Sequence, residues 1–198
     1  MTRLIFVRHG ETDWNKRKIL QGTSDIELNK NGLEQARKVA LRLKSEKIDV
    51  IYSSPLKRAY QTACAIAGEQ GIEVIRDDDL REVNYGVFEG RNIDELKNDE
   101  LWKERKKDKY NFKPPGGESY KEFFDKTILA IKRILKDNRG KTILISSHSA
   151  FIRSALIKVM DMDVAKGSNI RIYNTSVTEI EFMEDKPVLK VLNNSDHI

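Results

Sequence analysis

The chain begins with an apolar run whose chemistry changes abruptly where the run ends. Residues 4–7 are all apolar, and Arg8, His9 and Gly10 follow at once. Such a run predicts a short buried strand. In open α/β sheets, ligands bind just beyond the carboxyl ends of the strands, so we expect Arg8 and His9 beside a substrate. Gly10 allows the backbone to turn sharply or to approach a ligand closely.

Two further apolar runs end in the same way. The run at 142–145 leads through serines to His148, and the run at 50–52 leads through a Ser-Ser-Pro turn to Arg58. A single Arg-His pair after a strand is more often structural than functional. Here two of the three histidines follow apolar runs, whereas His197 lies in a polar tail and is expected to be inert. The repetition indicates one anion-binding site that holds a nucleophile.

The motif Arg8-His9-Gly10-Glu11-Thr12 resembles the signature of the histidine phosphatase superfamily, also called the phosphoglycerate mutase-like family. The similarity runs from Arg3 to about Tyr173, and its other specific parts are Ser54-Pro55-x-x-Arg58-Ala59, Leu80-x-Glu82 and Ser147-His148. The resemblance implies one domain over residues 1–198 with a three-layer α/β/α sandwich. Its central sheet is expected to be mostly parallel, with an antiparallel C-terminal strand or hairpin.

The resemblance also implies roles for five side chains. His9 is the nucleophile that forms a phosphohistidine, and Arg8 and Arg58 bind the phosphoryl oxygens. Glu82 is the proton donor to the leaving oxygen. His148 stabilises charge on the transferring group. These arginine and histidine groups neutralise a phosphate dianion by themselves, so neither a metal nor another cofactor is expected.

Three further substrate-binding residues are expected with less support. Spacing alone favours a turn asparagine at Asn15, whereas the resemblance implies an amide that contacts the phosphate. Tyr85 is expected to line the pocket. Ser149 stands where the family usually has glycine, and its hydroxyl either reaches the phosphate or tightens the loop. Thr12 and Gly22 are weaker candidates.

Composition limits the class of protein. The chain has 198 residues, 39% of them hydrophobic and 34% charged, which is typical of one soluble globular domain. No apolar run approaches the roughly 20 residues of a membrane span. The first strand starts so close to Met1 that no signal peptide is expected, which favours a cytoplasmic location. The net charge of +5 fits either a phosphorylated metabolite or a nucleic acid. No aromatic-basic motif supports nucleic acid, so neither nucleic acid nor membrane is an expected partner.

Two features that invite a chemical interpretation are expected to be structural. Cys64 is the lone cysteine, with no partner for an internal disulfide, and its alanine-rich surroundings predict a small buried helix residue. Residues 77–79 are three consecutive aspartates, which we interpret as a surface turn because no second metal-ligand motif accompanies them.

Hydrophobic periodicity and local signals predict the other elements. Asn29 is expected to cap a helix over about 30–43, and Pro55 to occupy the first position of the next helix, which places Arg58 in its first turn. The remaining expected helices cover 119–137 and 149–159, and the remaining expected strands cover 48–52, 72–75, 141–146, 170–173, 177–182 and 188–192, with a hairpin turn at 184–186.

Residues 91–118 differ in composition from the rest and predict an excursion over the site. Short helices, a basic run over 105–113 and a Pro-Pro-Gly-Gly ending are typical of a lid that sets substrate choice. The basic run is most simply a solvated face, and its alternatives are contact with a second anionic group or with RNA. Glu89 is expected to brace the loop between Gly86 and Gly90.

The leading interpretation is a metal-independent phosphatase that hydrolyses small phosphomonoesters, similar to alpha-ribazole and broad-specificity phosphatases. The runner-up is a phosphoglycerate mutase, which must shield its phosphoenzyme from water. A non-catalytic phosphate-binding module and a basic RNA-binding protein are the alternatives outside enzymes. Either a monomer or a homodimer, paired through an edge strand or the last hairpin, is compatible with the sequence.

Overall fold

The structure is a computed structural model that describes residues 1–184 and 186–198. In these residues six strands form one sheet in the order β3-β2-β4-β1-β5-β6. They are β1 (Thr2–Arg8), β2 (Val50–Ser53), β3 (Val74–Arg76), β4 (Thr142–Ser147), β5 (Val177–Met183) and β6 (Lys186–Asn194). The first four are mutually parallel, whereas β5 runs antiparallel to β1, and β6 to β5. The expected mixed sheet with an antiparallel C-terminal pair is confirmed.

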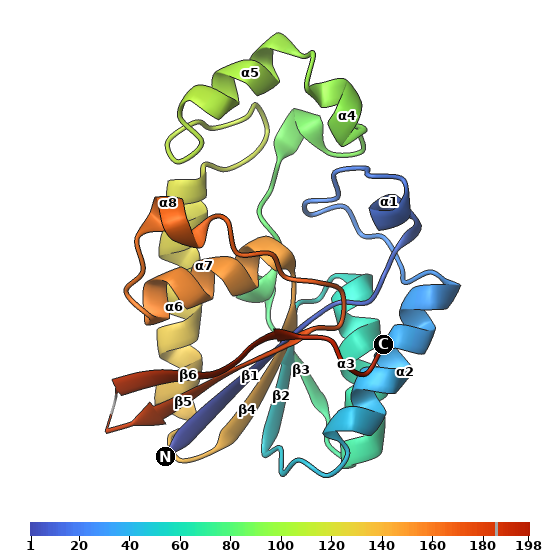
Figure 1. The fold of residues 1–198 in the computed structure, drawn as a ribbon, viewed down its shortest axis with the longest axis vertical. Helices are drawn as coiled ribbons and strands as arrows, with labels where there is room; N and C mark the ends of the chain where they lie inside the picture. Colours follow the sequence, from blue (N-terminus) through green and yellow to red (C-terminus); the bar gives the residue numbers. More distant parts are fainter. Residues whose placement is uncertain (185) are drawn as a thin grey trace.

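Helices cover both faces of the sheet, which gives three layers (Figure 1). Helices α2 (Lys30–Leu43) and α3 (Lys57–Gln70) pack on one face, and α6 (Tyr120–Asp137) and α7 (Ser149–Val159) on the other. Strand β1 alternates between two cores: Leu4 and Phe6 pack with α6 and α7, whereas Ile5 and Val7 pack with α2 and α3. Each such side chain is completely buried, which stabilises the fold by about 1.5–3 kcal/mol per residue.

Several short elements lie beyond the carboxyl ends of the parallel strands. They include α1 (Asp13–Lys16), α4 (Ile93–Leu96), α5 (Glu100–Lys107) and α8 (Val164–Gly167), and Figure 1 shows α4 and α5 as a separate layer farthest from the sheet. A small apolar cluster of Phe88, Leu96 and Trp102 holds this layer together. The short helices expected in 91–118 are therefore present.

The loop after β1 packs closely against the start of α2. A Cβ atom on Gly32 would lie 2.0 Å from the carbonyl oxygen of Glu11, and one on Gly10 would lie 2.5 Å from the carbonyl oxygen of Gly32. Gly10 therefore allows the backbone after β1 to lie in close contact with the backbone at Gly32. The Asn29 side chain accepts a hydrogen bond from the Gly32 amide, which confirms the expected helix cap. The loop that carries His9 thus rests on a rigid helix end.

Three expected element boundaries are wrong. Helix α3 begins at Lys57 with Leu56 as its N-cap, so Pro55 lies in the preceding turn and not at the first helical position. The Ser54 hydroxyl accepts a hydrogen bond from the Leu56 amide, so Leu56 is the N-cap and the helix starts after it. Strand β2 begins at Val50 and strand β3 at Val74, each two residues later than expected. Even so, Arg58 lies in the first turn of α3 as expected.

Residues 170–173 form no strand, although their apolar alternation predicts one. Two of their carbonyl groups accept hydrogen bonds from arginine side chains and not from a neighbouring strand. Ile172 accepts from Arg8 Nη1 at 2.6 Å, and Ile170 accepts from Arg153 Nη1 at 3.4 Å. The turn expected at 184–186 includes Asp185, which lies outside the described residues. Strands β5 and β6 on either side of it pair as expected.

Cys64 is exposed, which contradicts the expected buried position. The buried stripe of α3 consists of Ala59, Thr62, Ala63, Ile66 and Ala67, and Cys64 falls beside it. Small neighbours in the sequence do not reveal on which side of a helix a residue lies.

In the described residues no helix combines the length and the apolarity that a bilayer crossing requires.

Candidate active site

The carboxyl ends of β1, β2 and β4 bring four cationic or imidazole side chains together. Arg8 ends β1, His9 follows it, Arg58 lies in the first turn of α3 after β2, and His148 follows β4. Exposure is 3% for His9, 1% for Arg58 and 0% for His148. Each arginine lowers the pKa of both histidines, so the four groups lie within electrostatic reach of one another. Four of the expected site residues therefore meet at one edge of the sheet.

His9 is held as a neutral imidazole with one free nitrogen. Its Nδ1 lies 2.7 Å from the carbonyl oxygen of Gly10. Because a carbonyl oxygen only accepts, Nδ1 carries the proton and Nε2 keeps its lone pair. Burial, followed by the charges of Arg58 and Arg8, lowers the pKa of His9 well below its ordinary value. The side chain at this position is thus an uncharged base or nucleophile near neutral pH.

Backbone carbonyl groups anchor the two arginines. Arg58 donates from Nη1 to Ser24 and from Nη2 to Gly22, each at 2.7 Å. Arg8 donates from Nη1 to Ile172. Burial lowers the pKa of both guanidinium groups to about 10, so both stay charged at neutral pH. The Nε atoms of both are buried, with no hydrogen-bond partner in the part of the chain that the structure describes. Buried donors without partners are costly, and an anion would satisfy them.

His148 has one occupied and one unoccupied ring nitrogen. Its Nε2 lies 2.8 Å from Ser54 Oγ, and that oxygen already accepts from the Leu56 amide at 3.3 Å. Within the described residues, Nε2 is the acceptor that the Ser54 hydroxyl proton reaches, so the hydroxyl donates to Nε2 and the ring proton lies on His148 Nδ1. This Nδ1 is buried and lacks a partner within the described residues. The His148 and His9 rings lie 5.2 Å apart between centroids, so a third unsatisfied donor belongs to the same site.

Glu82 lies at the border of this cluster and at the start of α7. Its Oε2 accepts from the Ala150 amide at 3.2 Å, and its Oε1 from the Val83 amide at 3.2 Å. Its charge raises the pKa of Arg8 and of Arg58, which places the carboxyl group within reach of both guanidinium groups. Glu82 is 8% exposed, so it is a shielded acid next to an anion-binding cluster.

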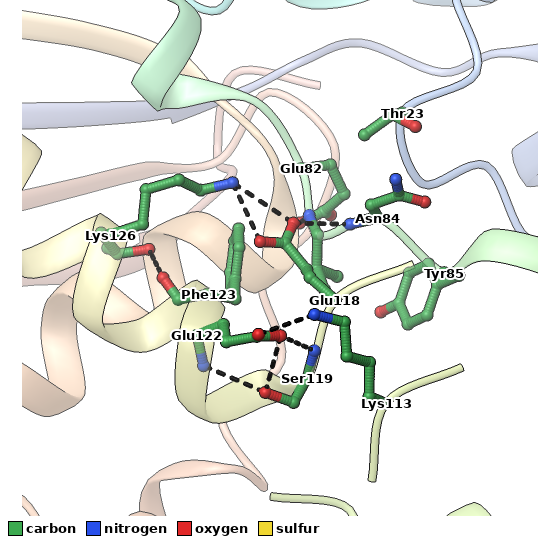
Figure 2. A network of polar contacts seen from close by, with 12 residues as sticks. Thr23, Glu82, Asn84, Tyr85, Lys113, Glu118, Ser119, Glu122, Phe123 and Lys126 are labelled. Carbon is green, nitrogen blue, oxygen red and sulfur yellow. Dashed lines mark hydrogen bonds and ion pairs between the residues drawn. The ribbon is translucent and has the colours of Figure 1, made fainter. Parts of the chain in front are cut away.

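A second carboxylate supports the segment that carries Glu82. Glu118 Oε1 accepts from the Asn84 amide at 2.9 Å, and Glu118 Oε2 forms an ion pair with Lys126 Nζ at 3.1 Å. Figure 2 shows Glu118 between Lys126 of α6 and the chain at Asn84, with Glu82 nearby. The segment is therefore tied to the long helix as well as to α7.

Glu89 has a wider role than the brace expected for the loop between Gly86 and Gly90. Its carboxylate accepts from the Tyr85 amide at 3.1 Å, and also from the amides of Thr23 at 2.8 Å and Ser24 at 3.0 Å. It thereby joins that loop to the segment whose carbonyl groups hold Arg58.

Asn15 and Ser149 lie next to the cluster. Asn15 Oδ1 accepts from the amide and the hydroxyl of Thr12, each at 3.1 Å, as part of the cap of α1. Only its NH₂ group is therefore able to donate to a ligand. Ser149 is the half-buried first residue of α7, directly after His148. Thr12 has a capping role, and Gly22 contributes a carbonyl group to Arg58.

A cavity of about 910 Å³ lies among α5, α6, α7 and the segment around α8. Tyr85, three residues after Glu82, lines it together with Trp102, Tyr120, Phe124 and Arg153. The hydroxyl groups of Tyr85 and Tyr120 lie 3.0 Å apart. Burial, followed by Tyr120 and Glu82, raises the pKa of Tyr85 well above its ordinary value. The cavity has the size and the mixed lining of a small-molecule site.

The three aspartates at 77–79 have partners of their own. Arg133 Nη2 lies 2.7 Å from Asp77 and 3.0 Å from Asp79. Within residues 1–184 and 186–198, no three His, Cys, Asp or Glu side chains are grouped as metal ligands.

Four residues in and around the site were missed from sequence. The sequence predicts only a turn at Ser54, although the residue lies within the Ser-Pro-x-x-Arg-Ala motif. Glu118 lies within the Gly-Gly-Glu-Ser segment and carried no assigned role. The sequence predicts only a helical position for Arg153, which lines the cavity. Asn174, which donates to the His9 carbonyl at 2.8 Å, has no recognisable signal in the sequence.

Comparison with known proteins gives consistent matches. The family model of the histidine phosphatase superfamily (branch 1) matches residues 4–195. Phosphoserine phosphatase 1 of Hydrogenobacter thermophilus is 32% identical over 200 residues, covering 100% of this chain and 95% of the relative. Phosphoglycerate mutase-like protein 4 of Arabidopsis thaliana is 36% identical, covering 98% and 86%.

Among solved structures, a mutant phosphoserine phosphatase of Entamoeba histolytica in complex with phosphoserine is similar, with a TM-score of 0.89, 36% identity and full coverage of both chains. The alpha-ribazole phosphatase of Shigella flexneri is similar with a TM-score of 0.90 and 25% identity, covering 98% of this chain and 96% of that one.

Proposed function

The chain belongs to the histidine phosphatase superfamily, and we propose that it hydrolyses small phosphomonoesters through a phosphohistidine on His9. Its phosphatase relatives and its family make it a phosphomonoester hydrolase. One observation carries the proposed route. A neutral His9 with a free Nε2 lies in a cluster that also contains two cationic guanidinium groups, each with an unpartnered buried Nε.

In the first step, the lone pair of His9 Nε2 attacks phosphorus and the phosphorus–oxygen ester bond breaks on the opposite side. Glu82, protonated in the substrate complex, donates its proton to the leaving oxygen. The alcohol departs, and the phosphoryl group remains on Nε2. The Gly10 carbonyl keeps the proton on Nδ1, so the reacting nitrogen is always the other one.

In the second step, a water molecule attacks the phosphohistidine. Glu82, now a carboxylate, accepts a proton from this water, the phosphorus–nitrogen bond breaks, and inorganic phosphate leaves. His9 and protonated Glu82 are restored.

Donors around the phosphoryl group lower the barrier to both steps. Arg8 and Arg58 offer Nε–H groups, and His148 offers Nδ1–H, to oxygens whose charge changes during transfer. Loss of one such donor typically reduces the rate by about 10²–10³. We assign the Asn15 NH₂ group and the Ser149 hydroxyl to further phosphate contacts, and Tyr85 to contact with the rest of the substrate.

The test is hydrolysis of p-nitrophenyl phosphate in excess EDTA by the native protein, by His9→Ala and by His197→Ala. His197 lies outside the site, where it contacts Arg42, so its variant controls for loss of a histidine. We expect the native protein and His197→Ala to turn over equally and His9→Ala to lose activity. An acid-labile phosphoenzyme should be trapped only where His9 is present.

Equal turnover by the native protein and His9→Ala would overturn the assignment of the nucleophile. Trapping of a phosphoenzyme that transfers its group between 2- and 3-phosphoglycerate, with no release of phosphate, would instead establish a mutase.

A further inference from the structure

The turn at Asn174 and Thr175 directly precedes β5 and lies against the end of β1. The Thr175 amide donates to the Arg8 carbonyl at 3.0 Å, and the Arg8 amide donates to the Ser176 carbonyl at 3.4 Å. These two bonds extend the contact between β5 and β1 to the last residue of β1. The turn therefore lies beside the point where the chain leaves the sheet and enters the loop that begins with His9.

The Asn174 side chain reaches two residues of this loop. Its Nδ2 donates to the carbonyl oxygen of His9 at 2.8 Å and lies 3.5 Å from Asn15 Oδ1. A side-chain amide carries two N–H groups, so one nitrogen is able to serve both acceptors. Asn174 thus links the peptide group of His9 to the side chain of Asn15.

This contact helps to fix the orientation of the Asn15 amide. Asn15 Oδ1 also accepts from the amide and the hydroxyl of Thr12, each at 3.1 Å. Three donors therefore converge on one oxygen. An Asn15 amide rotated by half a turn would place its NH₂ group against the amide of Thr12 and the NH₂ group of Asn174, and it would lose these bonds. The NH₂ group of Asn15 accordingly points away from them.

The backbone of the turn is strained. Thr175 has φ +52° and is completely buried. Residues with a branched Cβ rarely adopt this left-handed conformation. Such strain persists only where the surrounding structure imposes it, and strained residues cluster at functional sites. We interpret the strain as a consequence of the turn that presents Asn174 to the loop after β1.

The turn has supports that do not involve the Asn174 side chain. The Tyr173 amide donates to Asn193 Oδ1 at the end of β6, at 2.7 Å. The Ser176 hydroxyl donates to the Tyr173 carbonyl at 2.8 Å. Together with the two backbone bonds to Arg8, these contacts should keep the turn in place when the Asn174 side chain is shortened.

From this arrangement we propose that Asn174 is a positioning residue of the phosphate site, which holds Asn15 so that its NH₂ group points towards the phosphoryl oxygens. The proposal rests on the proposed function, which assigns the Asn15 NH₂ group to the phosphate. Asn174 itself does not touch the phosphate. It acts through Asn15, so the effects of changing the two residues on phosphate affinity should be coupled.

The test is calorimetric titration of inorganic phosphate into the full chain, as a double-mutant cycle. Asn15→Ala should weaken phosphate binding about 10- to 100-fold, the usual effect of losing a hydrogen bond to a charged group. Asn174→Ala should weaken it about 2- to 10-fold, because Asn15 remains but is no longer held in one orientation. When Asn15 is already alanine, Asn174→Ala should change the affinity by less than about 2-fold, since no amide is left to orient.

Two further variants separate donation from packing. Ser176→Ala removes a side-chain hydrogen bond from the same turn and should retain the native phosphate affinity. Asn174→Asp keeps the size of the side chain but carries no N–H group, so it should weaken phosphate binding at least as much as Asn174→Ala does.

An equal loss of affinity from Asn174→Ala with and without Asn15 would mean that Asn174 only supports the fold, and would overturn the proposal. Native affinity in Asn174→Ala or in Asn174→Asp would overturn it as well. Hydrolysis of p-nitrophenyl phosphate by the same proteins separates the two levels of inference. A native protein that binds phosphate without hydrolysing the ester would contradict the phosphatase function, and the coupling of Asn174 to Asn15 would still decide the positioning role. A native protein that binds no phosphate would overturn both.

Discussion

Ser54 Oγ lies 2.8 Å from His148 Nε2, and both side chains are completely buried. The hydroxyl accepts from the Leu56 amide and is placed to donate to the ring, so it determines which nitrogen of His148 carries the proton. A residue outside the proposed phosphate contacts thus controls the direction of a donor, His148 Nδ1, that we propose for the phosphate. The two residues come from different strand ends, and their contact joins the loop after β2 to the loop after β4.

Ser54→Ala should therefore lower kcat for p-nitrophenyl phosphate by about 10-fold or more, while KM changes little. The expected fall is smaller than the 10²–10³ that follows removal of a donor, because His148 itself remains. Ser54→Thr keeps the hydroxyl and should restore most of the rate. The acid limb of the pH–rate profile should also shift in Ser54→Ala, and an unchanged profile would contradict a role in positioning the His148 proton.

Acid should destabilise the folded protein through its buried histidines. Burial and the neighbouring arginines lower the pKa of His9 and of His148 well below 6.5, whereas the unfolded chain binds these protons near pH 6.5. The contribution of neutral His9 and His148 to the free energy of unfolding is therefore complete above about pH 6.5. It is lost as the pH falls towards the pKa that these histidines have in the folded protein. Urea unfolding at pH 7.5, 6.5 and 5.5 should give decreasing free energies. The decrease should be smaller in a His9→Ala/His148→Ala double variant, in which His197 remains, and equal slopes would contradict this origin.

Glu82→Gln should discriminate between leaving groups. An alkyl phosphate needs a proton on its departing oxygen, whereas p-nitrophenolate leaves without one. We expect kcat for an alkyl phosphate to fall by about 10²–10⁴ and kcat for p-nitrophenyl phosphate to fall much less. Exposed Glu73 provides the matched control, and Glu73→Gln should leave both rates unchanged. A uniform loss on both substrates in Glu82→Gln would argue against proton donation.

Two glycine-to-alanine changes in helices should have opposite effects on stability. A Cβ on Gly32 would lie 2.0 Å from the Glu11 carbonyl oxygen, so Gly32→Ala should destabilise the protein by at least about 1–3 kcal/mol and displace the loop that bears His9. Gly68 in α3 has no neighbouring atom within 4 Å of an added Cβ. Gly68→Ala should stabilise the protein by about 0.5–1 kcal/mol. Thermal melting of both variants, with activity measured alongside, tests the pair.

The elements that sequence predicted well have local causes. The cap at Asn29, the first turn of α3 that holds Arg58 and the helix entry at His148 each depend on a few consecutive residues. The convergence of Arg8, Arg58 and the two histidines followed from a general rule about strand ends and from a motif.

The features that sequence did not predict depend on contacts between distant segments. Ile170 and Ile172 give their carbonyl groups to Arg153 and Arg8 and not to a strand neighbour. Such partners are invisible in the local pattern of apolar residues. Cys64 illustrates the same limit, since the side of α3 that faces the core was set by its packing and not by the size of its neighbours.

The position of Arg105 could not be inferred at all from its place in a basic run. A cation in such a run is normally solvated, and only the folding of α5 over Tyr85 and Tyr120 buries this one. The lysines beside it in the sequence give no indication that Arg105 is buried.

The order of strands in the sheet has a consequence for how the protein is made. Strand β1, which leads to His9, lies between β4 and β5, whose first residues are Thr142 and Val177. A nascent chain therefore holds the strand that leads to His9 without sheet partners until about three quarters of the chain has left the ribosome. Contacts of such long sequence separation form slowly and leave apolar strands exposed in the meantime. Premature termination anywhere before β4 should yield an inactive fragment that chaperones or proteases must remove.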